Sequence, residues 1–111
     1  MYDGQYGELL LDEAIVGVFS TWHMTVETPK PGMQLRVIHI PELRLTHGAN
    51  AFREGAAMRA KSLNNFAAMP FVTAQLYDRS AGQRLWTITR CTVTTLEPVN
   101  QDVFEAELVE Q

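Results

Sequence analysis

The chain has 111 residues, of which 46% are hydrophobic and 20% charged, with one cysteine and a formal net charge of −4. That length suits a single domain over residues 1–111, and the composition argues against wholesale disorder. No apolar run approaches the roughly 18–20 residues of a membrane span, one cysteine excludes a disulfide framework, and the acidic balance argues against generic nucleic-acid binding.

The charged residues are segregated along the chain. Residues 1–29 hold five carboxylates and no Lys or Arg, residues 30–90 hold all nine basic residues, and residues 91–111 again hold five carboxylates and no basic residue. Two interpretations are open. The acidic ends fold back against the basic middle of the same chain, or part of this complementarity lies between neighbouring copies, and both can hold together. An acidic surface would also repel a polyanion.

The N-terminal part is expected to form two strands joined by a tight turn. Residues 7–11 are expected to be a short strand and Asp12-Glu13 the turn, although Asp-Gly is the more typical pair. Residues 14–27 are rich in β-branched and aromatic side chains, which favours a long strand. Two prolines and a glycine then predict a loop over residues 28–32.

The middle of the chain is expected to hold a strand and one helix. Residues 33–40 alternate in polarity, which predicts a strand that Pro41 stops, with residues 42–46 continuing in extended form at an edge or a bend. Apolar side chains recur at helical spacing over about residues 49–63. This pattern predicts a helix that packs against the sheet.

The C-terminal part is expected to be three strands. Residues 70–78 and 84–96 are predicted to form a hairpin, a change of phase at Thr89-Arg90 indicates a bulge, and residues 102–110 alternate as the last strand. With some six or seven strands and one helix, the chain is predicted to be mainly β. We expect an antiparallel β-sandwich or partly open barrel with one α-helix against it.

The sequence contains no pattern that indicates catalysis. The three histidines, His23, His39 and His47, lack the spacing that places two imidazoles on one metal. Cys91 is expected to be buried in a strand, and alternation sends the neighbouring Arg90 to the opposite face. No carboxylate pair is placed for acid–base chemistry, and no phosphate loop or nucleophile elbow is present. We therefore expect no enzyme, no cofactor and no metal.

Parts of the sequence resemble phage tail-tube (major tail) proteins. The stretch GQYGELLLDEAIVGVFSTWHMTVETP resembles their opening, which is a pair of small residues, a short strand, a tight turn and a long strand that carries a tryptophan. The segments LYDRSAG, RLWTITRCTVTTLEP and VFEAELVE resemble the order in which these proteins close. Asp12-Glu13 stands where a glycine turn would be expected. The chain is also short for the family, so loops that contact a sheath or neighbours are expected to be reduced.

The resemblance implies a structural virion protein that self-assembles. Such proteins form hexameric rings that stack into a tail tube, through which DNA passes without specific binding during ejection. The implied partners are copies of the chain itself and other tail or neck proteins, including a sheath where there is one. The implied location is the virion tail, with the host cytoplasm during assembly and no membrane.

Five residues are candidates for contacts in such an assembly. Arg36, Arg44 and Arg59 are expected to be basic partners across a subunit boundary, and Glu105 and Glu107 to be carboxylates facing the channel or the boundary. The predicted helix and the loop over residues 28–32 are candidates for contact with neighbours. Two alternatives stay open: another phage structural module, such as a head–tail joining ring or a capsid decoration protein, and a small barrel that binds a ligand or single-stranded nucleic acid.

Overall fold

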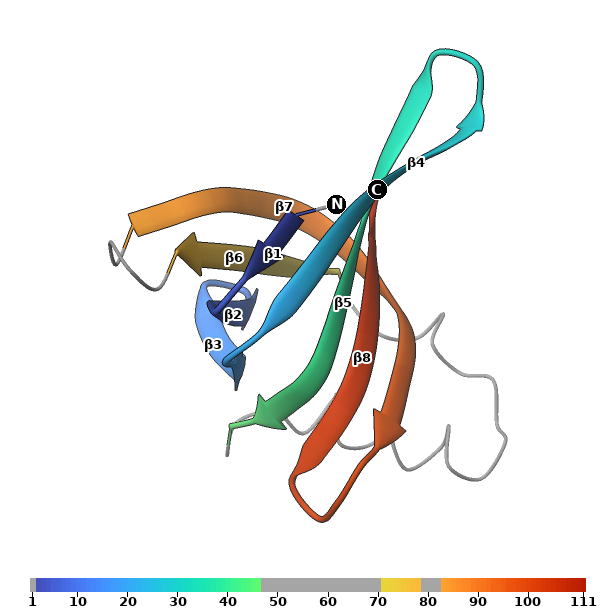
Figure 1. Ribbon diagram of the computed structural model, residues 1–111. Helices are drawn as coiled ribbons and strands as arrows, with labels where there is room; N and C mark the ends of the chain where they lie inside the picture. Colours follow the sequence, from blue (N-terminus) through green and yellow to red (C-terminus); the bar gives the residue numbers. More distant parts are fainter. Residues whose placement is uncertain (1, 47–70, 79–82) are drawn as a thin grey trace.

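The computed structural model describes residues 2–46, 71–78 and 83–111, which form β-strands in antiparallel pairs (Figure 1). The mainly β class is therefore confirmed. No helix in these ranges is long and apolar enough to cross a membrane, and the helix expected over residues 49–63 lies outside the described residues. In chain order the strands are β1 (Tyr2–Gly4), β2 (Tyr6–Leu11), β3 (Ala14–Phe19), β4 (Trp22–Lys30), β5 (Met33–Leu45), β6 (Val72–Asp78), β7 (Gln83–Pro98) and β8 (Val103–Glu110).

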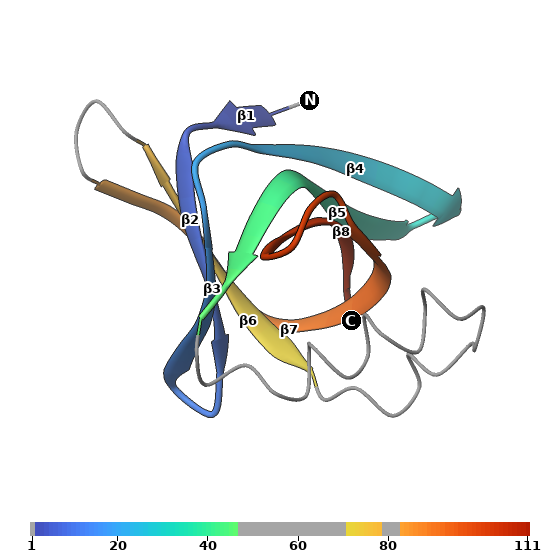
Figure 2. The same cartoon turned by 90° about the horizontal axis from the view of Figure 1, so that it is seen from below.

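Six of these strands close into a barrel. Neighbours pair in the order β5, β3, β2, β6, β7 and β8, and β8 pairs again with β5 (Figures 1 and 2). β4 extends the sheet beside β5, and β1 lies beside β4. The expected sandwich or partly open barrel is therefore corrected to a closed barrel. Closure is possible because β5 pairs with β8 on one edge and with β4 and β3 in succession on the other.

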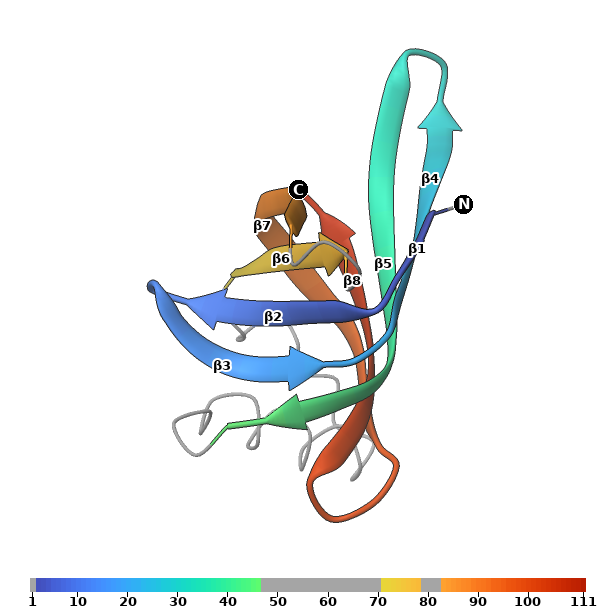
Figure 3. The same ribbon diagram turned by 60° about the vertical axis from the view of Figure 1, so that its left-hand side comes forward.

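The sheet turns a corner at the middle of β5. Residues 14–27, expected as one strand, are divided at Ser20 and Thr21 into β3 and the first part of β4. At the same level β5 carries Pro41, where its register with β8 shifts. Pro41 therefore lies at a bulge, where a missing N–H is tolerated, and does not end the strand as expected. Beyond it β5 pairs with β3 instead of β4 (Figure 3).

Two local predictions are confirmed. Asp12 and Glu13 form a tight turn between β2 and β3, with positive φ angles of 51° and 69°. The pairing of β6 with β7 shifts register at Thr89-Arg90, where the phase change indicated a bulge. Both features depend on residues that are neighbours along the chain, so the local sequence is sufficient to predict them.

The loop expected over residues 28–32 is wrong, because this segment is the end of a hairpin. β4 continues to Lys30, and a turn of two residues, Pro31 and Gly32, leads into β5. Gly32 has a φ of 81°, which a glycine adopts without steric cost. Pro29 is tolerated because the register of β4 with β5 shifts there.

Apolar side chains fill the barrel, and no polar or charged side chain is buried among the described residues. Trp22 is fully buried and lies edge-on to Trp86, with the ring centroids 5.8 Å apart. Its indole Nε1 donates a hydrogen bond of 3.0 Å to the carbonyl oxygen of Tyr6. Five other strands contribute side chains that are at most 2% exposed: Leu9, Ile38, Leu76, Ile88, Leu96 and Leu108 belong to this set.

Cys91 is part of this core, as predicted. Its side chain is fully buried as a free thiol, with Sγ 3.7 Å from the carbonyl oxygen of Ile88. Burial raises the pKa of the Cys91 thiol to about 11. The thiol is therefore protonated and shielded at neutral pH, which suits a structural cysteine and not a nucleophile.

Candidate interaction surfaces

A hairpin projects from the barrel. We call residues 26–35, at the adjoining ends of β4 and β5, the arm (Figures 1 and 3). β1 pairs only with residues 22–24 of β4, and β8 begins to pair with β5 at Val37. Among the described strands, both outer edges of the arm are therefore unpaired. Val26 and Met33 are each 45% exposed on it. Free strand edges with exposed apolar side chains are a template for pairing with another chain.

A row of acidic and imidazole side chains crosses the outer face of the sheet. Asp3, His23, His39 and Glu107 lie opposite one another on β1, β4, β5 and β8. His23 Nδ1 and Asp3 Oδ1 are 2.6 Å apart, and the two imidazole rings stack with centroids 6.2 Å apart. His39 Nε2 lies 3.9 Å from Glu105 Oε1. Sequence spacing does not reveal this row, because its members meet only through strand pairing.

The row is not arranged as a metal centre. In residues 2–46, 71–78 and 83–111, no group of three or more His, Cys, Asp or Glu side chains is placed to hold a metal ion. Each histidine instead has a carboxylate beside it, Asp3 for His23 and Glu105 for His39. A shallow pocket of about 430 Å³ lies beside the row, and its lining includes both histidines and Glu107.

The structure places Glu105 and Glu107 together on this outer face. Both lie on β8 between the inward-facing Phe104, Ala106 and Leu108. The Glu107 Oε1 accepts a hydrogen bond of 3.2 Å from the Thr94 hydroxyl. Glu105 lies directly opposite Glu97 on β7, and like charges in such a pair destabilise a sheet. The outer face therefore carries a concentrated negative charge.

Arg36 has a partner within its own chain. Its guanidinium forms an ion pair with the carboxylate of Glu110 at the end of β8, with an Nε to Oε2 distance of 3.0 Å. Hydrogen bonding between the two groups raises the pKa of Arg36 and lowers the pKa of Glu110. Here the acidic end of the chain does fold back on the basic middle. A role for Arg36 at a subunit boundary stays a prediction.

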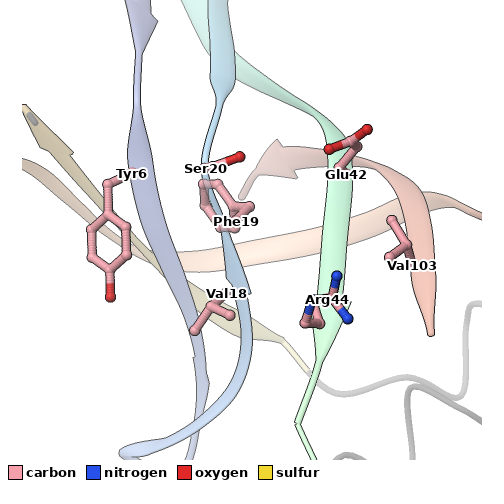
Figure 4. Close-up of a pocket in the computed structure, with 7 residues that line it drawn as sticks. All are labelled: Tyr6, Val18, Phe19, Ser20, Glu42, Arg44 and Val103. Carbon is pink, nitrogen blue, oxygen red and sulfur yellow. The ribbon is translucent and has the colours of Figure 1, made fainter.

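Arg44 lines a small cavity at the end of β5 away from Arg36 (Figure 4). This cavity, which we call the side pocket, has a volume of about 260 Å³. Val18, Phe19 and Val103 give it an apolar floor. Exposed polar side chains rim it: Tyr6, Ser20, Glu42 and Arg44. Neither Glu42 nor Arg44 forms an ion pair with another described residue, and Arg59 lies outside the described residues.

A cluster of two tyrosines and an arginine lies on β2, β6 and β7. The rings of Tyr6 and Tyr77 are 5.3 Å apart, and the Arg84 guanidinium lies 5.8 Å from the Tyr77 ring centroid. The Tyr77 hydroxyl lies 3.0 Å from the carboxylate of Glu8. Desolvation by burial, and then the Glu8 charge, raise the pKa of Tyr6. The two tyrosine rings of this cluster suit base stacking, but the negative charge of the adjacent Glu8 carboxylate would repel a nucleic acid.

In comparisons with known proteins, no family model, no curated protein and no solved structure matches this chain.

Proposed function

We propose that the protein is a structural component that assembles with copies of itself, and that its place is the tube of a phage tail. In this proposal the chain forms hexameric rings that stack around a channel for DNA. The observation that carries the proposal is the arm. It extends two strand edges that no other described strand pairs with, and the exposed side chains of Val26 and Met33, away from the barrel.

Self-assembly accounts for the arm better than a solitary barrel does. An isolated hairpin is marginally stable in water, and exposed strand edges promote unwanted association unless a neighbour covers them. A second copy can cover the arm through backbone pairing or through side-chain contacts. When the arm and its receiving surface differ, the contact is head-to-tail, and such contacts close into rings if the rotation between copies fits.

The acidic outer face supports the same proposal. Glu105 and Glu107, with Asp3 and Glu97, concentrate negative charge on one side of the sheet. Such a face would repel the phosphates of DNA, which suits the wall of a conduit. Other ring-forming phage modules would have the same need, so a head–tail joining ring or a capsid decoration protein stays the structural alternative.

The tyrosine cluster favours a second candidate, a barrel that binds single-stranded nucleic acid. Tyr6 and Tyr77 offer adjacent rings, and Arg84 adds a positive charge. A salt-sensitive gel shift with single-stranded DNA, lost when Tyr77 is replaced by Ala, would support this function over the first.

The experiment that tests self-assembly follows the purified protein by light scattering and negative-stain microscopy as its concentration is raised. We expect sixfold rings or stacked tubes. The double variant Val26→Asp/Met33→Asp should stay monomeric with an unchanged circular dichroism spectrum, because both side chains are exposed in the monomer. Val99→Asp is the matched control, since Val99 is 55% exposed but lies outside the arm. A wild-type chain that stays monomeric at every concentration overturns the proposal.

A further inference from the structure

We propose that the arm of one copy docks into the side pocket of a second copy, with Met33 on the apolar floor and Lys30 beside Glu42. This inference rests on the self-assembly proposed above and names the surface that receives the arm. The side pocket has an apolar floor, an open rim and two charged groups without ion-pair partners among the described residues. It therefore has the features of a receiving site for an amphipathic segment.

A chain cannot fill its own pocket with its own arm. Met33 begins β5, whereas Glu42 and Arg44 lie near its other end, beyond the bend at Pro41. Arg44 is eleven residues along β5 from Met33, which corresponds to about 36 Å of extended chain. Figure 3 shows the arm rising from the end of β5 opposite to the part that pairs with β3. The contact must therefore join two copies and be of the head-to-tail kind.

One face of the arm carries the side chains that fit. Lys30 lies directly opposite Met33, and Glu27 directly opposite Leu35, so all four side chains lie on the same face of the hairpin. Met33 is long, flexible and 45% exposed, and a thioether adapts well to an irregular apolar cavity. A cavity of about 260 Å³ holds one such side chain.

The charges of the two surfaces match in order and in spacing. Met33 and Leu35 are two residues apart on β5, so their partners Lys30 and Glu27 are separated by about 6.6 Å along the strand direction. Glu42 and Arg44 are also two residues apart on one face of β5, with the same separation of about 6.6 Å. Lys30 can therefore meet Glu42 while Glu27 meets Arg44. Exposed pairs of this kind determine register and partner more than affinity.

Zero-length carbodiimide cross-linking tests this contact directly, because it joins an amine to a carboxylate only when the two touch. The sequence has just two lysines, Lys30 and Lys61, so few products are possible. In an equal mixture of isotope-labelled and unlabelled protein, we expect peptides that join Lys30 of one copy to Glu42 of another. Glu42→Gln should abolish that product. Asp12→Asn, at the turn between β2 and β3 and at the far end of β3 from Phe19, should leave it unchanged.

Charge reversal provides the second measurement. Lys30→Glu and Glu42→Lys should each weaken association roughly tenfold, because each places like charges together. The double variant Lys30→Glu/Glu42→Lys should restore most of the loss. If oligomers form but Lys30 cross-links elsewhere, or the double variant is weaker than either single one, the pocket assignment is overturned and the proposed function stands. If wild-type protein forms no oligomer, both are overturned.

Discussion

The barrel core and the arm share two strands, β4 and β5, yet the side chains of these strands have opposite environments in the two regions. In the core, Trp22 and Met24 of β4 are at most 1% exposed. Two residues further along the same face, Val26 is 45% exposed, and Met33 across the hairpin is equally exposed. Alternation of polar and apolar residues continues through both regions. It specifies a strand, but not whether another part of the same chain covers its apolar side chains.

This difference indicates where stability and interaction reside. The buried side chains of the barrel supply the hydrophobic stabilisation of the fold, whereas the exposed apolar side chains of the arm supply little until a second molecule covers them. Substitutions in the barrel should therefore lower the free energy of unfolding, and substitutions in the arm should alter association. The four predictions that follow test this separation.

The largest effect is expected from Trp22→Ala. The substitution leaves a cavity beside Trp86 and removes the hydrogen bond to the Tyr6 carbonyl, so the free energy of unfolding should fall by about 3–5 kcal/mol. Val26→Ala on the arm should change it by less than about 0.5 kcal/mol. Urea unfolding followed by circular dichroism measures both. Equal losses for the two variants would show that the arm is part of the core.

A smaller loss is expected from Gly7→Ala. Gly7 lies opposite Phe19, whose ring covers the glycine so closely that an added Cβ would lie 2.1 Å from Cε2. The ring must move, at a cost of roughly 1–3 kcal/mol in unfolding free energy. In a double-mutant cycle, Gly7→Ala should cost little once Phe19 is replaced by Leu. A full cost in that background would show that the strain is in the backbone and not in the ring contact.

The features that could be predicted from the sequence are those that depend on neighbours along the chain. The Asp12-Glu13 turn, the bulge at Thr89-Arg90 and the burial of Cys91 each follow from local spacing and alternation. Chain pattern also gives the mainly β class. The barrel's closure does not follow from it, because closure depends on β5 having different partners along its two edges.

The candidate surfaces depend on strand register, which a single sequence does not specify. His23 and His39 are 16 residues apart, yet they lie opposite each other on β4 and β5. Arg36 and Glu110 are 74 residues apart and form an ion pair. The segregation of charge did indicate that the acidic ends meet basic residues. It could not identify the partners, because every carboxylate of the C-terminal segment fits the same electrostatic pattern.

The ion pair between Arg36 and Glu110 lies where the arm joins the barrel. The pH dependence of the unfolding free energy therefore tests how much this pair stabilises the junction. The Arg36 hydrogen bond lowers the pKa of Glu110 in the folded state, below its ordinary value of 4.5. The stabilisation is therefore complete above about pH 5 and is lost as the pH falls through the lowered folded-state pKa. Both side chains are partly exposed, which limits it to about 1 kcal/mol.

Glu110→Gln should therefore lower the unfolding free energy at pH 7, and its difference from wild type should shrink below about pH 4. Glu13→Gln, exposed at the turn between β2 and β3, is the matched control and should show neither effect. Chemical unfolding across the pH range measures both variants. A difference that grows towards low pH would contradict the sign of the Glu110 shift.

The smallest effect is expected at the turns, where the arm has the less strained backbone and the barrel the more strained one. The arm turn has Gly32 at its positive φ of 81°, whereas the barrel turn has Glu13 at 69°. A left-handed backbone conformation costs a residue other than glycine about 1–2 kcal/mol. Replacing that residue by glycine removes this cost, but the greater freedom of glycine in the unfolded state offsets up to about 1 kcal/mol of the stabilisation. Glu13→Gly should therefore raise the unfolding free energy by about 0.5 kcal/mol, and Gly32→Ala should not raise it. Thermal unfolding detects a shift of this size, and a lower stability for Glu13→Gly would mean that the Glu13 side chain stabilises the turn despite its backbone.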